Sequence, residues 1–156
     1  MSALLAIALA AALPLHKSHE VTRIRSESAD YDRNAGIVVF EGHVQVEHAG
    51  EYTMHAESVY AVMTSSNELG HVVAIGNVTI TNASRVGMCE MAKFRRARRE
   101  IEMFGGGKGG RARLVDCGDR PGELEGDKIK FWLDAEQVEV ENPRITTRGK
   151  EGMELL

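Results

Sequence analysis

Past residue 20 the sequence has almost no helical periodicity, little proline and no excess of positive charge. Three prolines stand against sixteen glycines, and 27% of the 156 residues are charged. With its valine-rich alternating runs, this composition favours an all-β chain of many short strands. The length fits one domain with appendages. The net charge of -4 argues against a nucleic-acid-binding domain, which would usually be basic.

Motifs for metal binding, phosphate binding and catalysis are also missing. No CxxC or HxxxH spacing is present, and His43 and His48 lie on opposite faces of their predicted strand, which opposes shared metal ligation. The GGGKGG run lacks the Ser or Thr and the helix that a phosphate loop needs. No G-x-S-x-G elbow or catalytically spaced carboxylate pair is found. We therefore expect that the chain is not an enzyme and that it binds no metal and no other cofactor.

The strongest pattern present is an alternating segment, 37–48, that returns in altered form as 72–82. Gly42 interrupts the first copy and Gly76 the second. Glycine inside a strand usually marks a bulge or bend, so the repeat favours a sheet that curls round an interior. An ordinary two-sheet core with accidental glycines is the alternative. By parity, one apolar face of these half-buried strands contains Val38, Phe40, Val44, Val46, Val78 and Ile80.

A longer repeat includes further strands and turns. The segment ADYDRNAGIVVFEG from Ala29 resembles AKFRRARREIEMFGG from Ala92, and AESVYA from Ala56 resembles GDKIKF from Gly126. Two similar multi-strand units are thus stacked in series, which is typical of a spiral β fold. Strands are also expected in YTMHAESVYAVM, RARLVDC, GELEGDKIKFWL and QVEVEN.

The first residues form a short hydrophobic segment. The apolar run from Ala3 to Leu15 is too short to span a bilayer as a helix and fits the core of a signal peptide. No Lys or Arg precedes it, so the basic start lies upstream, or the segment is a poor signal or an anchor resting on the membrane. We assign residues 1–19 to this segment, 20–145 to the β domain and 146–156 to a loose tail.

The order of these motifs resembles the LptA/OstA-like family of lipopolysaccharide transport proteins. The resemblance rests on FEGHVQV, AESV, AIGNVTI, LEGDKIKF and DAEQVEVEN, and extends from about Glu27 to Asn142. It implies a twisted β-jellyroll, open at both ends, that binds lipid A acyl chains inside. The residues it places in the interior are Phe40, Val44, Val46, Val78, Ile80, Ile129, Val138 and Val140. Tyr60 precedes by one place the family's usual aromatic position, which leaves the facing of segment 52–63 open.

The resemblance also implies a function and partners. It describes a periplasmic bridge that carries lipopolysaccharide toward the outer membrane, with an LptC-like protein at one end and an LptD-like protein at the other. Open strand edges allow head-to-tail homo-oligomers. Two alternatives stay open: an LptC-like membrane-anchored component of the same pathway, and a β-solenoid scaffold with a packed core and no ligand.

Two groups of side chains are candidates for other roles. The basic run Arg95, Arg96, Arg98 and Arg99 suits lipid phosphates, although a solvated hairpin tip is favoured because the matching turn DRNAG is not basic. Cys89 and Cys117 could form one disulfide in an oxidising compartment, but their spacing does not show that they meet.

Overall fold

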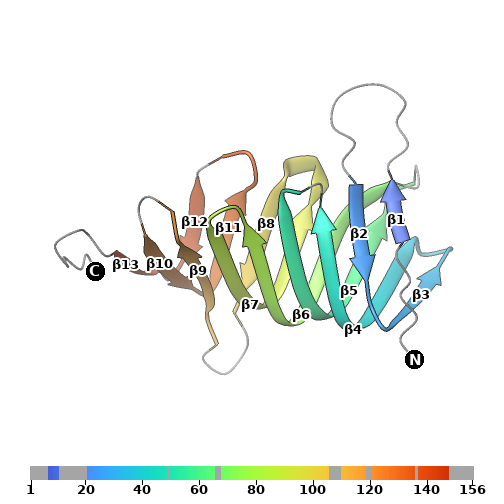
Figure 1. The fold of residues 1–156 in the computed structure, drawn as a ribbon, viewed down its shortest axis with the longest axis horizontal. Coiled ribbons are helices and arrows are strands. Elements are labelled where there is room, and N and C mark those ends of the chain that lie inside the picture. The colour runs from blue at the N-terminus through green and yellow to red at the C-terminus, as the bar shows by residue number, and fades with distance from the viewer. Residues whose placement is uncertain are drawn as a thin grey trace.

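The computed structural model describes residues 21–48, 50–65, 68–105, 110–118, 121–135 and 137–147, together with the backbone of residues 7–10. These residues form one antiparallel sheet of thirteen strands with one 3-10 turn (Figure 1). In chain order the elements are β1 (Ile7–Ala10), β2 (Val21–Arg25), β3 (Ser28–Asp32), β4 (Ile37–His48), β5 (Tyr52–Met63), β6 (Leu69–Asn82), β7 (Arg85–Arg95), η1 (Arg96–Arg98), β8 (Glu100–Phe104), β9 (Ala112–Asp116), β10 (Gly122–Gly126), β11 (Lys128–Trp132), β12 (Val138–Glu141) and β13 (Arg144–Thr147).

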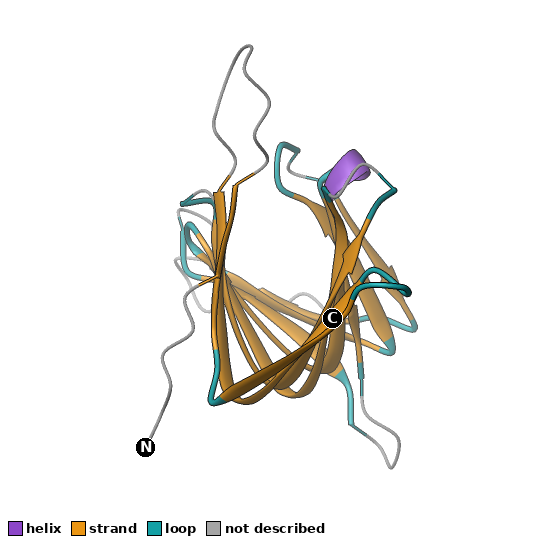
Figure 2. Ribbon diagram, turned by 90° about the vertical axis from the view of Figure 1, so that its right-hand side faces the viewer, coloured by secondary structure: helices purple, strands orange, loops and turns teal. Residues whose placement is uncertain are grey.

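The sheet is folded lengthwise, and the long strands β4 to β7 run through both halves. β3 pairs with the first half of β4 and β2 with its second half. Likewise, β9 pairs with the first half of β7 and β8 with its second half. Seen down the long axis, the strands form two facing arms joined by a bend (Figure 2). We call the half with β2, β9, β10 and β13 the first arm, and the half with β3, β8, β11 and β12 the second arm.

The inner faces of the two arms form a single hydrophobic core. Its largest fully buried side chains include Phe40, Phe94 and Phe131. Alternation places these residues inward and their neighbours outward along β4 and β11, and along β7 it is interrupted once, between Cys89 and Ala92. The prediction of an all-β chain curled round an interior is therefore confirmed, and the sheet path runs from β1 to β12 without closing.

The facing of β5, which the sequence left open, changes within the strand. Tyr52, Met54 and Ala56 point inward, and after a register shift between His55 and Ser58 the inward residues are Val59 and Ala61. In β5 the single residue Glu57 lies opposite the two-residue bulges of β4 and β6, so the parity of the inward residues is inverted beyond it. Tyr60 is consequently half-buried on the outer face, and the position inside belongs to its neighbour.

Glycines with left-handed backbone angles make the bend between the arms. Gly42 has a φ of 85° and Gly76 a φ of 88°, and the residues that follow them, His43 and Asn77, are also left-handed. The register of β4 with β5 and of β6 with β7 shifts at these positions. Each glycine is thus part of a bulge that turns the strand from one arm into the other.

At each repeat of the bend, an acidic side chain pairs with the side chain of a left-handed residue. Glu27 Oε1 lies 2.7 Å from His43 Nδ1, and Asn77 Nδ2 donates to Glu57 Oε1 at 3.0 Å. A third pair follows in the second unit, where Asn142 Nδ2 donates to Asp127 Oδ2 at 2.6 Å. The left-handed residue is the partner each time, since Asn142 has a φ of 50°. We call these three pairs the corner staples.

Several boundaries differ from the sequence prediction. The segment GELEGDKIKFWL is not one strand but two, since β10 lies in the first arm and β11 in the second. Residues 144–147 form β13 on β10, so the first residues of the predicted loose tail are ordered, while 148–156 lie outside the described residues. Within the predicted leader, 1–19, the backbone of residues 7–10 forms β1 on the edge of β2.

Candidate functional site

The space between the arms buries most of the residues that were predicted to line an interior. Val38, Phe40, Val44, Val46, Val78, Ile80 and Ile129 are at most 6% exposed. Val138 and Val140, on the edge strand β12, are half-buried and pack against this core. The structure therefore brings all nine side chains to one inner surface. Their contact with a lipid stays a prediction.

Sequence reasoning missed some of the largest inward side chains. Met54, Phe94, Ile101, Met103 and Phe131 are at most 1% exposed. Parity within β8 and β11 would have found three of them, whereas Phe94 lies beyond a change of parity in β7 and Met54 depended on the undecided facing of β5. With these residues the inner surface consists mainly of aliphatic, thioether and phenyl groups, which associate with hydrocarbon in preference to water.

Side chains from both arms meet along the free rims opposite the bend, and we call this line the seam. The ring of Phe94, in the second arm, lies 4.9 Å from the ring of His48 and 5.0 Å from that of Tyr52, both in the first arm. Arg99, after η1, forms an ion pair with Glu51 in the turn between β4 and β5. These contacts hold the arms together along the half of the seam nearer β2.

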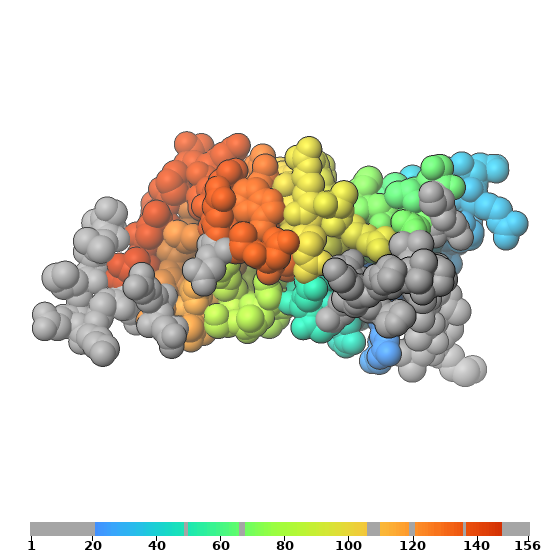
Figure 3. All heavy atoms as spheres, turned by 90° about the horizontal axis from the view of Figure 1, so that it is seen from above, coloured from blue at the N-terminus to red at the C-terminus, as the bar shows by residue number. Residues whose placement is uncertain are grey.

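Toward the C-terminal end the seam opens into a groove of about 810 Å³. Seen from above, the turn between β6 and β7 lies on one rim and the turn between β11 and β12 on the other (Figure 3). Arg99 Nε lies 3.5 Å from Asp134 Oδ2 at its edge. We call this the seam groove; its lining residues are Asn82, Ala83, Ser84, Arg85, Asp116, Gly118, Trp132, Leu133, Asp134 and Ala135.

The predicted basic run lies in the turn between β7 and β8, and acidic residues accompany it. Arg95 Nη2 lies 3.5 Å from Glu102 Oε1, and Arg96 Nη1 lies 3.7 Å from Glu68 Oε2. Arg99 pairs with carboxylates from two other turns, as described above, and Arg98 is exposed. Three of the four arginines thus have a carboxylate partner, which favours an ion-paired turn over a phosphate site.

Two buried carboxylates on the outer face of β8 were not anticipated. Glu100 and Glu102 are only 2% and 6% exposed, because the side chains of β7 and β11 cover them. Burial disfavours the charge of Glu102, but a hydrogen bond with Glu100 and the charges of Lys128, Arg95 and Lys130 outweigh it and lower the pKa of Glu102. In the sequence, Glu100 and Glu102 alternate with apolar residues, as solvent-facing residues of a strand do. Only the pairing of β8 with β7 and β11 reveals this buried network.

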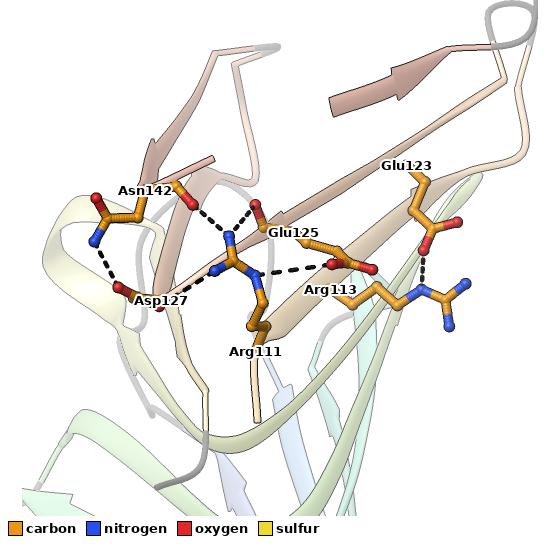
Figure 4. A network of polar contacts seen from close by, with 6 residues as sticks. All are labelled: Arg111, Arg113, Glu123, Glu125, Asp127 and Asn142. Carbon is orange, nitrogen blue, oxygen red and sulfur yellow. Dashed lines mark hydrogen bonds and ion pairs between the residues drawn. The ribbon is translucent and has the colours of Figure 1, made fainter. Parts of the chain in front are cut away.

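A second polar network fastens the C-terminal end of the bend (Figure 4). Arg111 Nη1 lies 3.7 Å from Asp127 Oδ1, and its Nε lies 3.8 Å from Glu125 Oε2. The same guanidinium donates to the carbonyl oxygen of Asn142. Arg111 thereby joins the start of β9 to the crossing from β10 to β11 and to the end of β12. Beside it, Arg113 pairs with Glu123 across β9 and β10.

The structure does not bring the two cysteines together. Both thiols are free: Cys89 is buried on the inner face of β7, and Cys117 is exposed after β9. The backbone N–H of Cys117 donates to the carbonyl oxygen of Ser84 at 2.8 Å, at the other end of the first-arm part of β7. Burial raises the pKa of Cys89 to about 12, so this thiol stays protonated.

Within the described residues, no group of three or more His, Cys, Asp or Glu side chains could hold a metal ion. The same part of the chain contains no helix long and apolar enough to cross a membrane. Most of the GGGKGG run lies outside the described residues.

The profile of the LptA/(LptD N-terminal domain) LPS transport protein family matches residues 23–137. A similar solved structure is that of LptH from Pseudomonas aeruginosa, described as the LptA homologous periplasmic component of the conserved lipopolysaccharide transport device. The two share 16% sequence identity and superpose with a TM-score of 0.69 over 83% of this chain and 95% of LptH. No curated protein matches the chain in sequence.

The superposition on LptH confirms the predicted open-ended β-jellyroll. At this low sequence identity the match shows that the two proteins share a fold. The family profile spans the long strands, the bend and the inner surface, from β2 to the turn after β11. The chain therefore belongs to the LptA/(LptD N-terminal domain) family of lipopolysaccharide transport proteins.

Proposed function

We propose that the chain holds the acyl chains of lipopolysaccharide between its two arms and carries the lipid across the periplasm. The observation that supports this best is the continuous apolar inner surface of both arms in a member of a lipopolysaccharide transport family. Burying an acyl chain there stabilises the complex by about 0.8 kcal/mol per CH₂ group. The mechanism involves binding and transfer and has no covalent step.

The proposed compartment follows from two observations. The structurally similar LptH is described as a periplasmic component. The apolar run in residues 3–15 suits a signal for export, with cleavage expected between about Pro14 and Glu20 by the usual position after the apolar core.

Strand parity in β6 provides a direct test of the lipid-carrying interior. Val78 is buried on the inner surface, whereas its neighbour Thr79 lies on the outer face. A photo-crosslinking residue in place of Val78 should capture lipopolysaccharide in cells, and the same residue in place of Thr79 should not. Mass spectrometry of the crosslinked product identifies the lipid.

Each position is the control for the other, because Val78 and Thr79 are consecutive residues of the same strand with side chains on opposite faces. Equal capture at both would mean that the lipid lies on the outer surface. Capture at neither, in protein that is folded and exported, would favour a packed scaffold, which the close burial of the inner side chains also suits.

The ends of the sheet are the proposed contacts with partners. β3 lies at one end, and β12 and β13 lie at the other, so their outer edges can pair with a strand of another chain. We propose LptC-like and LptD-like partners at opposite ends, and head-to-tail pairing between copies, because the two ends differ.

Ending the chain before Gln137 removes β12 and β13 and should abolish concentration-dependent oligomers. Sedimentation at increasing concentration measures the oligomers, and circular dichroism checks that the remaining strands still form. Unchanged oligomers in a folded, shortened chain would show that these edges are not the contact.

A further inference from the structure

We propose that the seam groove binds the saccharide headgroup of the amphiphile whose acyl chains lie between the arms. This inference rests on the proposed function and adds a second binding surface to it. The groove lies between the two rims, on the side opposite the bend. Its volume of about 810 Å³ is within the range of about 300–1,000 Å³ that is usual for ligand sites.

A polar headgroup has to leave the interior at some point along the arms. The inner surface is formed by buried aliphatic and aromatic side chains such as Val72, Phe94 and Ile101. Placing sugar hydroxyls against them would leave these hydroxyls without hydrogen bonds, which is costly. An amphiphile with its chains inside must therefore have its headgroup at an end of the jellyroll or at the seam.

One half of the seam is closed by contacts between the arms, and the other half is open to a ligand. In the half nearer β2, the rings of Phe94, His48 and Tyr52 are in contact, and the ion pair between Arg99 and Glu51 lies in the same half. In the other half, the groove separates the rims. Leu133 both lines the groove and packs against the core, so the polar groove adjoins the apolar interior.

The lining of the groove fits hydroxyl groups better than phosphate. Asp116 and Asp134 provide two carboxylates, and the guanidinium of Arg85 already lies 3.6 Å from Asp116. Asp134 likewise lies 3.5 Å from the guanidinium of Arg99, so the positive charges that the described residues bring to the groove are already matched by carboxylates and none of them is left over to bind a phosphate. Carboxylate and amide groups such as that of Asn82 do form strong hydrogen bonds with sugar hydroxyls. The charges therefore point to the saccharide and not to its phosphate substituents.

A bulky side chain in the groove should separate headgroup binding from acyl-chain binding. Ala135 lines the groove from the exposed turn on the second-arm rim and is not part of the inner surface, so Ala135→Trp should occupy the groove and leave the inner surface unchanged. The probes are radiolabelled lipopolysaccharide that carries its core sugars and radiolabelled myristate, which has an acyl chain but no sugar. The variant should bind lipopolysaccharide at least about tenfold more weakly, since losing one hydrogen bond to a carboxylate already has that effect. Its affinity for myristate should not change.

Ala35→Trp is the matched control, because Ala35 also lies in an exposed turn but at the other end of the sheet. It should bind both probes as the unmodified protein does. Ser84→Trp, on the opposite rim of the groove, should reproduce the effect of Ala135→Trp.

Three results would overturn the assignment. Unchanged lipopolysaccharide affinity in both groove variants would place the headgroup elsewhere, and equal weakening of both probes would make the groove a path to the interior. Displacement of lipopolysaccharide by inorganic phosphate would mean that the seam groove binds phosphate groups and not the saccharide. If the unmodified protein bound neither probe, the proposed lipid carrier itself would fail, a result distinct from the other three.

Discussion

Gly76→Ala should lower the free energy of unfolding by about 3 kcal/mol, which corresponds to roughly 10 °C in Tm for a domain of this size. The backbone of Gly76 has a φ of 88°, and a left-handed conformation costs an L-residue about 1–2 kcal/mol. A Cβ at this position would lie 2.5 Å from Glu57 Oε2 and 2.9 Å from Glu57 Cβ. The carboxylate can swing away, but the Cβ of Glu57 cannot move without its backbone. The corner staple between Glu57 and Asn77 is lost as well, at about 1 kcal/mol.

Gly50→Ala is the matched control for this prediction. Gly50 also has a positive φ, 70°, but a Cβ built on it has no heavy atom within 4 Å. This substitution should therefore show the backbone strain alone, about 1–2 kcal/mol. Thermal unfolding followed by circular dichroism measures both variants. Equal destabilisation by the two substitutions would mean that the contact with Glu57 does not contribute to the bend.

Stability should fall as the pH drops below the ordinary range of a glutamate, because Glu102 has a lowered pKa in the folded chain. Its contribution is fully present above the pKa of the unfolded chain, near 4.5, and is lost as the pH falls through the lower folded value. The cationic groups that face it are Arg95 and Lys93 on β7 and Lys128 and Lys130 on β11, and Glu100 is its neighbour on β8.

Glu102→Gln removes this charge at every pH. At neutral pH it should cost about 2–3 kcal/mol, less than the 3–5 kcal/mol for a fully buried ion pair, because the lysine and arginine heads can still reach water. The loss of stability below pH 4.5 should become shallower than in the unmodified chain.

Glu139→Gln is the control, since Glu139 faces Lys130 from β12 but is exposed. It should change stability by no more than about 0.5 kcal/mol, as surface substitutions usually do. Urea unfolding across a pH series measures all three proteins. Parallel acid profiles for Glu102→Gln and the unmodified chain would rule out Glu102 as the source of the acid sensitivity.

Alternation along single strands was enough to predict the all-β fold and the inner surface. Val38 and Phe40 precede Gly42, and Val44 and Val46 follow it, with the same parity on both sides. The bulge in β4 therefore did not disturb the prediction. In β5 a single residue lies opposite the two-residue bulges of β4 and β6, so the parity is inverted between Ala56 and Val59, and no glycine marks the change in sequence. A pattern along one strand cannot show a shift that is defined by the strands beside it.

The polar features depended on contacts between distant segments and could not be read from the sequence. Glu100 and Glu102 alternate with Ile101 and Met103 as solvent-facing residues would, and only the strands paired on either side bury them. The seam groove joins three turns that are far apart in the chain. By contrast, the repeat of the AESV and GDKI segments did indicate that Glu57 and Asp127 have equivalent positions, since both belong to corner staples.

The corner staples make the bend a local joint. Each one uses an acid at one crossing between the arms and a left-handed residue at an adjacent crossing, and Glu27 with His43 closes independently of Asp127 with Asn142. Joints of this kind let a chain grow by duplication of whole units, because a new unit brings its own fastening and meets only its immediate neighbours. The length of the passage between the arms is then set by how many units are copied, with no change to its cross-section.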